Sequence, residues 1–377
     1  MIKKILPAMI GAALVAGVTN AAADVTAMGH IDTSLNTTKN ELLQNNDRLN
    51  NMACTTCSFG FKGSEDLGNG LAAIFKIDFQ YDSTERNNKT GLTDRDQWLG
   101  LKGDAWGQIR LGTISTSYKS HGAMIDPIYR TAAQGRDWGL QSGLHSGAGD
   151  DAAQGRATNT IRYDSPTLAG FMATAHYTVQ TETQTDPKAD SPWGIGAQWK
   201  AGGYLAFADY ITSDFSGDDD AWKVGGRAAF GNFAIFGQYE GDNGAISRRQ
   251  SLSIYDSDLD TADSDGIVTV KGQEVPGVGD GADVWFIGGT AGFGNSLIYA
   301  AYGQGKDGSG TGASYVDDGD TVVLDDDPDT EYDSWEIVGV HSLSKRTKAY
   351  FGYMSQDFKT SGAGTVDNWS LGMKHTF

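Results

Sequence analysis

Apolar and polar residues alternate with a period of two along much of the chain. Between Leu71 and Asp82 the side chains fall on two faces, one apolar and one mostly polar or charged. The same split recurs over residues 156–164 and 171–180, and again over residues 368–377. Because the side chains of a β-strand point alternately to opposite faces, these segments are predicted to be two-faced strands.

The connections between the predicted strands alternate between short turns and long polar loops. Tight turns such as Gly68-Asn69-Gly70 and Gly294-Asn295 are typical of one rim, and seven such turns are expected. Eight long loops are expected near residues 39–55, 83–93, 115–155, 183–191, 213–220, 242–281, 305–333 and 356–366. This pattern predicts an all-β fold, a 16-stranded antiparallel transmembrane β-barrel with short periplasmic turns and long extracellular loops.

The alternation alone is also compatible with a soluble β-sandwich, but the connections favour a membrane barrel. Aromatic residues such as Trp98, Tyr239, Trp335 and Trp369 fall near the ends of predicted strands, as in an interfacial girdle. No apolar run after residue 23 is long enough for a spanning helix, so a closed barrel is the spanning structure that remains. A barrel of this size is expected to enclose a water-filled lumen.

The amino-terminal segment reads as a secretory signal peptide. Lys3 and Lys4 precede an apolar stretch from Ile5 to Val18, and Ala21 and Ala23 suit cleavage after residue 23. The alternative, a membrane anchor, is disfavoured because the apolar stretch is too short to cross a bilayer. We therefore expect residues 1–23 to be removed and residues 24–377 to form one barrel domain.

The charge balance excludes nucleic acid as a partner and predicts an acidic mouth. The chain has 48 Asp and Glu against 29 Lys and Arg, whereas a polyphosphate requires clustered bases. Acids are concentrated in two predicted loops, at residues 256–265 and 317–331. They are expected to concentrate cations and to bind lipopolysaccharide through bridging divalent ions.

Several segments in order along the chain resemble the trimeric general porins of Gram-negative bacteria, of the neisserial and proteobacterial type. They include Phe59-Gly60-Phe61-Lys62-Gly63, residues 95–103, residues 107–112, residues 156–166 and the terminal Gly372-Met373-Lys374-His375-Thr376-Phe377. The resemblance implies a homotrimer in the outer membrane, in contact with its lipid. It also implies that loop three, residues 115–155, folds into the barrel, and that the barrel-assembly machinery reads the terminal Phe377.

The resemblance further predicts the constriction of the pore. It places acids of loop three opposite arginines of the barrel wall, and opposed charges across a narrow wet pore create a transverse field. A third wall arginine is expected where this chain has Ser58. The alternative is that these charges are simply solvated. The predicted constriction residues are Arg95, Arg156, Arg110, Arg162, Asp126 and Asp137.

Cys54 and Cys57 form a Cys-x-x-Cys motif just before the second predicted strand. Ser58 follows, so the haem-attachment signature is absent, and two cysteines do not complete a zinc site. In an exported protein a local disulfide at the extracellular rim is one outcome and free thiols are the other. The six histidines show no metal-ligand spacing, so neither a metal nor a cofactor is expected.

The sequence therefore predicts an outer-membrane porin, not an enzyme, through which small hydrophilic solutes and ions diffuse passively with a mild preference for cations. The first alternative is a substrate-specific channel, for example for phosphate, but Lys76, Lys348 and Lys374 look too scattered for the basic ladder it needs. The second alternative is an outer-membrane barrel hydrolase, with Ser146 beside His145 as its candidate nucleophile.

Overall fold

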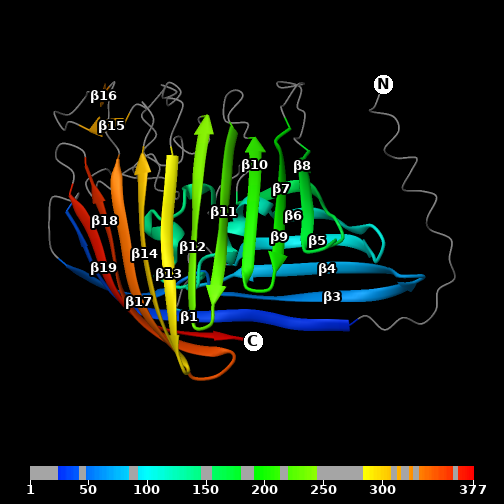
Figure 1. The fold of residues 1–377 in the computed structure, drawn as a ribbon, viewed down its shortest axis with the longest axis horizontal. Coiled ribbons are helices and arrows are strands. Elements are labelled where there is room, and N and C mark those ends of the chain that lie inside the picture. Colours follow the sequence, from blue (N-terminus) through cyan, green and yellow to red (C-terminus); the bar gives the residue numbers. More distant parts are fainter. Residues whose placement is uncertain are drawn as a thin grey trace.

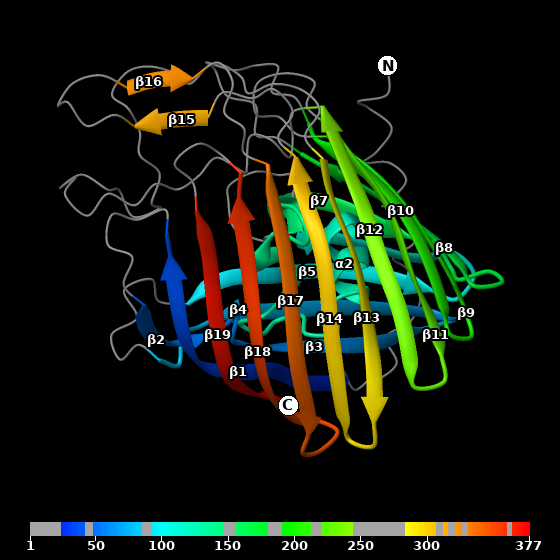
Figure 2. The ribbon, with the colours of Figure 1, turned by 60° about the vertical axis from the view of Figure 1, so that its left-hand side comes forward.

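The computed structural model describes residues 24–41, 48–84, 92–145, 155–179, 191–212, 220–243, 283–306, 312–315, 322–325, 331–359 and 364–377. Most of these residues belong to one antiparallel sheet of 17 strands (Figures 1 and 2). Its strands are β1 (Asp24–Asn40), β2 (Leu49–Cys54), β3 (Ser58–Gly68), β4 (Leu71–Gln80), β5 (Thr93–Gly103), β6 (Gly107–Ser115), β7 (Arg156–Asp164), β8 (Phe171–Thr178), β9 (Trp193–Ala201), β10 (Tyr204–Thr212), β11 (Asp220–Phe230), β12 (Phe233–Asn243), β13 (Asp283–Phe293), β14 (Ser296–Lys306), β17 (Tyr332–Ser342), β18 (Thr347–Phe358) and β19 (Thr365–Thr376).

The sheet closes on itself, because β1 pairs with β19. At the seam the Gly29 N–H donates to the Phe377 carbonyl (3.1 Å) and the Phe377 N–H donates to the Gly29 carbonyl (3.0 Å). β2 and β3 both pair with β1, so they are two segments of one barrel strand. The 17 segments therefore make the closed 16-stranded barrel that the sequence predicted.

The expected first long loop, residues 39–55, is wrong in extent. β1 continues to Asn40 and β2 begins at Leu49, and the Thr37 hydroxyl donates to Asn50 Oδ1 (2.6 Å) across the pair. This part of the wall has polar residues on both faces, so it shows no apolar alternation. Between β14 and β17, β15 (Gly312–Tyr315) and β16 (Val322–Asp325) form a separate two-stranded sheet.

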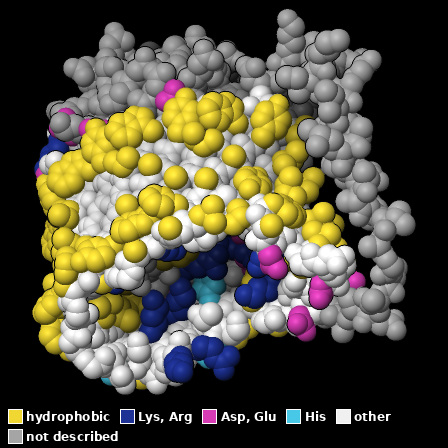
Figure 3. Space-filling model, turned by 45° about the vertical axis from the view of Figure 1, so that its right-hand side comes forward, with side chains coloured by type: hydrophobic (Ala, Val, Ile, Leu, Met, Phe, Trp, Pro, Cys, Tyr) yellow, Lys and Arg dark blue, Asp and Glu magenta, His cyan; other side chains and the backbone are white. Residues whose placement is uncertain are grey.

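Apolar side chains cover the outer face of the wall, and polar side chains face the lumen. Leu371 and Met373 of β19 are 54% and 55% exposed, whereas Ser370 and Lys374, which flank this pair in the sequence, are buried. Figure 3 shows the outer apolar surface. Outward aromatic rings stack from strand to strand, as Tyr353 does between Trp335 (4.9 Å) and Trp369 (4.8 Å).

Trp98 does not belong to this girdle. Its partner across β4 is Lys76, which faces the lumen, and the Arg110 guanidinium lies 5.1 Å from the centre of the Trp98 ring. The sequence placed Trp98 at a strand end, but the bulge in β5 described below changes which residues face outward.

Loop three crosses the inside of the barrel, as the resemblance implied (Figures 1 and 2). It joins β6 to β7 and contains α2 (Ser117–Met124) and two 3-10 turns, η2 (Gly135–Trp138) and η3 (Gly143–His145). An apolar cluster holds it against the inner wall of β10 to β18, where burying apolar surface stabilises the contact. The principal members of that cluster are Ile125, Ile128 and Leu140 of the loop and Phe207, Phe236, Phe286, Tyr299 and Met354 of the wall. Among the described residues, no helix has the length and apolarity needed to cross a membrane.

Candidate functional site: the pore constriction

A β-bulge in β5 directs two adjacent charged side chains into the lumen. The register between β4 and β5 shifts between Ile77 and Phe79, and β5 holds the extra residue there. An extra residue interrupts the alternation of faces. As a result Arg95 and Asp96, although neighbours in sequence, both contact side chains of the lumen wall.

Asp96 joins two bases of the wall. Its carboxylate lies 2.9 Å from Lys76 Nζ and 2.9 Å from Arg156 Nε. It also accepts hydrogen bonds from the Ser115 N–H (3.1 Å) and hydroxyl (2.7 Å) at the start of loop three. Asp96 therefore connects β4, β5 and β7 at the root of the loop.

Arg95 lies beside this group. Its guanidinium donates to Gln80 Oε1 (2.6 Å) and lies 3.4 Å from Asp78 Oδ2, which is 3.6 Å from Lys76 Nζ. Arg95 is 3% exposed and Arg156 is 8% exposed. The two predicted wall arginines thus lie in one network, but their counter-charges come from the wall and not from loop three.

A second network contains the other two predicted arginines. Arg110 and Arg162 are directly opposed on β6 and β7, and both bind Asp164, with Arg162 Nε at 2.9 Å from Asp164 Oδ1. Gln108 also donates to this carboxylate (2.6 Å). Like charges directly opposed on a sheet repel, and here the shared carboxylate offsets the repulsion.

Asp126 is turned into loop three. Its carboxylate accepts the backbone N–H groups of Ile128 (3.0 Å) and Gly135 (3.1 Å), and the side chain is buried. Burial raises its pKa to about 6. The structure therefore does not bring Asp126 opposite the wall arginines, and its geometry is that of a residue that shapes the loop.

Asp137 is 45% exposed and faces a different region of the lumen. It accepts from Gln134 Nε2 (2.6 Å) and lies 3.5 Å from Arg136 Nε. It lines a cavity of about 190 Å³ between loop three and the polar upper parts of β1, β2 and β19. Its partners are thus loop residues, and no ion pair joins it to Arg95 or Arg156 within the described residues.

The side of loop three nearest the wall arginines carries bases. Lys119 of α2 is buried, and burial together with the nearby charges of Arg156 and Arg136 holds its pKa well below the usual range. The guanidinium groups of Arg130 and Arg136 lie 5.7 Å and 5.5 Å from the centre of the Tyr129 ring. The transverse arrangement of loop acids against wall bases is therefore not present among these residues.

Glu240 of β12 fixes the two ends of loop three. It accepts hydrogen bonds from the Tyr118 hydroxyl (2.7 Å) and from the Ser142 hydroxyl (2.6 Å) and N–H (3.1 Å). Gln238 Nε2 donates to the same carboxylate (2.5 Å). A buried carboxylate with this many donors is satisfied without a fully paired cation.

A second anchor joins loop three to β10 and β11. Lys223 donates to the Tyr118 carbonyl and to His145 Nε2 (2.9 Å), while His121 Nδ1 lies 3.0 Å from Asp209 Oδ2. Burial and the Lys223 charge hold the pKa of His145 well below its usual range. A neutral His145 can accept the Lys223 proton donor at Nε2, while its Nδ1 lies 3.2 Å from the Ser142 carbonyl.

The tip of loop three is held by two lysines near the seam of the barrel. Lys374 of β19 donates to the carbonyls of Tyr129 (2.8 Å) and Arg130 (3.1 Å). Lys348 of β18 donates to the Pro127 carbonyl (3.4 Å). The loop therefore reaches across the lumen from β6 to β18 and β19.

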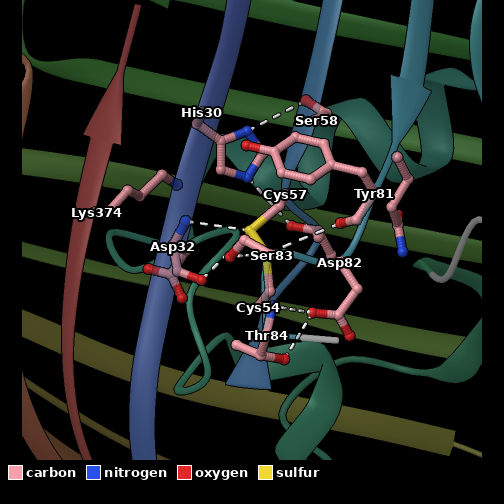
Figure 4. Close-up of a disulfide and its surroundings, with 12 residues drawn as sticks. His30, Asp32, Cys54, Cys57, Ser58, Tyr81, Asp82, Ser83, Thr84 and Lys374 are labelled. Atoms are coloured by element: carbon pink, nitrogen blue, oxygen red, sulfur yellow. Dashed lines mark hydrogen bonds between the residues drawn. A yellow bond between two sulfur atoms is a disulfide. The ribbon is translucent and has the colours of Figure 1, made fainter. Parts of the chain in front are cut away.

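Cys54 and Cys57 lie within the second barrel strand, not before it, and are joined by a disulfide (Figure 4). The disulfide occupies the interruption between β2 and β3, where Thr56 has a φ of 50°. Cys57 Sγ accepts the Asp32 N–H (3.3 Å), which replaces a ladder hydrogen bond lost at the interruption. The disulfide therefore stabilises a bulge in the pore wall.

Ser58 occupies the position where the resemblance led us to expect a third wall arginine. Its hydroxyl lies 3.2 Å from His30 Nδ1, and both side chains are buried (Figure 4). A small hydroxyl and an imidazole thus replace a full positive charge at this point of the wall. No group of three His, Cys, Asp or Glu side chains suited to a metal occurs in the described part of the chain.

Several residues of the site were not found from the sequence. Three acids of the wall read as ordinary polar positions of strands in the sequence, namely Asp78, Asp96 and Asp164. A signal was present for one of them, because two adjacent charged residues, Arg95 and Asp96, break the alternation of faces and indicate a bulge. The wall anchors of loop three, such as Glu240 and Lys223, have no local signal, because their partners lie about a hundred residues away.

Comparisons with known proteins agree with this fold. A model of the Gram-negative porin family matches residues 8–361. The major outer membrane protein P.IB of Neisseria sicca is 30% identical over 173 residues, which cover 45% of each chain. That of Neisseria lactamica is 23% identical over 328 residues, covering 84% of this chain and 82% of the relative.

The chain spans about half or less of the length of most of these curated relatives, for example 38% of a P.IB protein of Neisseria gonorrhoeae. Among solved structures, the anion-selective porin from Comamonas acidovorans has a TM-score of 0.66 at 19% identity. That similarity covers 94% of this chain and 100% of the other, and it shows a shared fold.

Proposed function

Because this chain belongs to the Gram-negative porin family, we propose that it forms a water-filled channel in the outer membrane through which small hydrophilic solutes and ions diffuse passively. The observation that carries the proposal is the combination of a closed barrel, an apolar outer face and a charged lumen narrowed by an anchored loop. A packed structural barrel has no need of clustered charges inside, whereas a path for hydrated solutes does.

The charges at the constriction favour anions. Cations were expected to be preferred because of the acidic loops, but residues 256–265 lie outside the described residues, as do most of residues 317–331. In the two wall networks and the part of loop three beside them, the bases outnumber the acids. The bases are Lys76, Arg95, Arg110, Arg156, Arg162, Lys119, Arg130 and Arg136, and the acids are Asp78, Asp96, Asp164, Asp126 and Asp137.

The assembly of the channel is also a proposal. A homotrimer, contacts with lipopolysaccharide and recognition of Phe377 by the barrel-assembly machinery follow from family membership. Removal of residues 1–23, which lie outside the described residues, would leave Asp24 at the first residue of β1. The family assignment is that of a channel, so it disfavours the hydrolase alternative built on Ser146.

The test is the zero-current potential of the purified protein in a planar bilayer across a KCl gradient. We expect open-channel steps and a potential whose sign shows preference for chloride. The double variant Arg95→Gln/Arg156→Gln is expected to reduce that preference several-fold, because it removes two unit positive charges from the lumen wall. Arg227→Gln, a lumen position of β11 away from the constriction, serves as the matched control.

Two outcomes would contradict the proposal. Folded protein without conductance would exclude an open channel. A cation preference that the double variant leaves unchanged would show that the acidic loops, and not the wall arginines, set the selectivity.

A further inference from the structure

A basic cavity opens into the lumen at the rim of the short turns. It has a volume of about 280 Å³ and lies between the β17–β18 turn and the end of β19. Figure 3 shows a hollow below the outer apolar surface in which Lys and Arg side chains gather. The cavity is lined by Ser342, Ser344, Lys345, Arg346, Thr347, Lys348, Lys374 and Thr376, and none of these is acidic.

Two of these lysines are directly opposed in the sheet. Lys348 of β18 pairs with Lys374 of β19, and like charges in opposed positions destabilise a sheet. The opposed pair Arg110 and Arg162 shares a carboxylate, but no ion pair to Lys348 or Lys374 is found in the described residues. The charges of Asp32 and Asp126 act on both lysines, but neither carboxylate forms an ion pair with them. The two ammonium groups therefore have no direct carboxylate partner in the described part of the chain.

The four bases retain hydrogen-bond donors for such an anion. An ammonium group has three donors, and Lys374 uses two of them on loop-three carbonyls while Lys348 uses one. Lys345 and Arg346 are exposed and make no ion pair within the described chain. The backbone that carries them is fixed, because the Ser344 hydroxyl accepts the N–H groups of Arg346 (3.1 Å) and Thr347 (3.0 Å).

The cavity faces the lumen and not the lipid. Met373 of β19 and Phe351 of β18 are 55% and 52% exposed on the outer wall, so Lys374 and Lys348, which have the opposite parity, point inward. The phosphate groups of membrane lipids lie outside the barrel wall. An anion that reaches this cavity is therefore a solute of the channel.

We propose that the cavity is a binding site for a phosphate-class oxyanion, either inorganic phosphate or a small phosphate ester. The proposal rests on the proposed channel function, and it adds a solute class to it. Several oxygens are needed to engage four bases and the neighbouring hydroxyls together, which a phosphate supplies and a halide does not. The volume also accommodates several waters, each of about 30 Å³ in the liquid, so the ion need not be fully dehydrated.

The experiment measures binding of inorganic phosphate to the folded full-length barrel in detergent by calorimetry. In parallel, it measures the chloride current through single channels as phosphate is added. We expect saturable binding and a saturable fall in the chloride current. Lys345→Gln/Arg346→Gln should weaken the apparent phosphate affinity roughly tenfold, because two charged donors are lost. Both positions are exposed in a turn, so folding is expected to survive.

The matched control is Lys62→Gln/Lys102→Gln, which removes two lumen bases of β3 and β5 that do not line the cavity. An unchanged phosphate affinity in the control supports the site. Equal weakening in both double variants, or no saturable binding to a conducting channel, would overturn it and leave the channel function intact. Loss of conductance in the folded wild type would instead overturn the channel, while calorimetry would still decide the site.

Discussion

At the scale of single residues, the constriction depends on two adjacent charged residues that do not follow the alternation of faces in a strand. Arg95 and Asp96 both face the lumen only because they form the β-bulge of β5, where two residues oppose one residue of β4. Asp96 then lies between Lys76 and Arg156 and cancels part of their charge. The local field of the pore is therefore set by a carboxylate on the same wall as the bases it pairs with.

Neutralising that carboxylate should make the pore more selective for anions. We predict that Asp96→Asn increases the preference for chloride over potassium by roughly two- to fivefold, because Lys76 and Arg156 lose a counter-charge a few Å away. The zero-current potential across a salt gradient measures the change. Asp104→Asn, in the turn after β5, is the control, and an equal effect there would show that only net charge matters.

At the scale of elements, loop three is positioned by the wall and not by its own secondary structure. α2 has eight residues and the two 3-10 turns are shorter, so none is stable in isolation. The loop is held instead by the apolar cluster around Leu140 and by the hydrogen bonds to Glu240 and from Lys374. Removing one anchor should therefore free part of the loop while leaving the barrel intact.

Glu240→Ala tests this dependence. It removes the acceptor of the buried Ser142 hydroxyl and N–H, and each buried donor left unsatisfied costs about 1–3 kcal/mol. We expect cleavage within residues 116–145 by an added protease and an increase in open-channel current noise, with an unchanged strand content by circular dichroism. Glu331→Ala, an exposed position, should show neither effect. A protease-resistant, quiet Glu240→Ala channel would show that the apolar cluster alone suffices.

At the scale of the whole molecule, the sequence predicted the barrel well because strands, turns and loops have local signals. The alternation from Leu71 to Asp82 and the glycine-rich turns required no knowledge of distant contacts. The first loop was placed wrongly because the upper wall at Thr37 and Asn50 is polar on both faces. The loop-three acid Asp126 was placed at the pore because its partners, the backbone N–H groups of Ile128 and Gly135, depend on a loop fold that no periodicity encodes.

The last prediction concerns two roles of Phe377, the closure of the barrel and its recognition by the barrel-assembly machinery. A variant of the ring can distinguish them. The residue exchanges two backbone hydrogen bonds with Gly29 at the seam, and its ring packs where a side chain at residue 29 would lie, 2.6 Å from an added Cβ. Phe377→Ala keeps both backbone bonds and loses only the ring. We therefore predict that Phe377→Ala refolds nearly normally in detergent, as measured by the heat-dependent shift of the folded barrel on a gel. In cells, we predict a large loss of folded protein from the outer membrane. Gly29→Val should impair both, because its Cβ would lie 2.3 Å from the Ser58 carbonyl oxygen of the neighbouring strand as well as against the Phe377 ring. If Phe377→Ala fails to refold in detergent as well, the ring is needed for closure itself, and recognition by the assembly machinery is no longer required to explain its effect in cells.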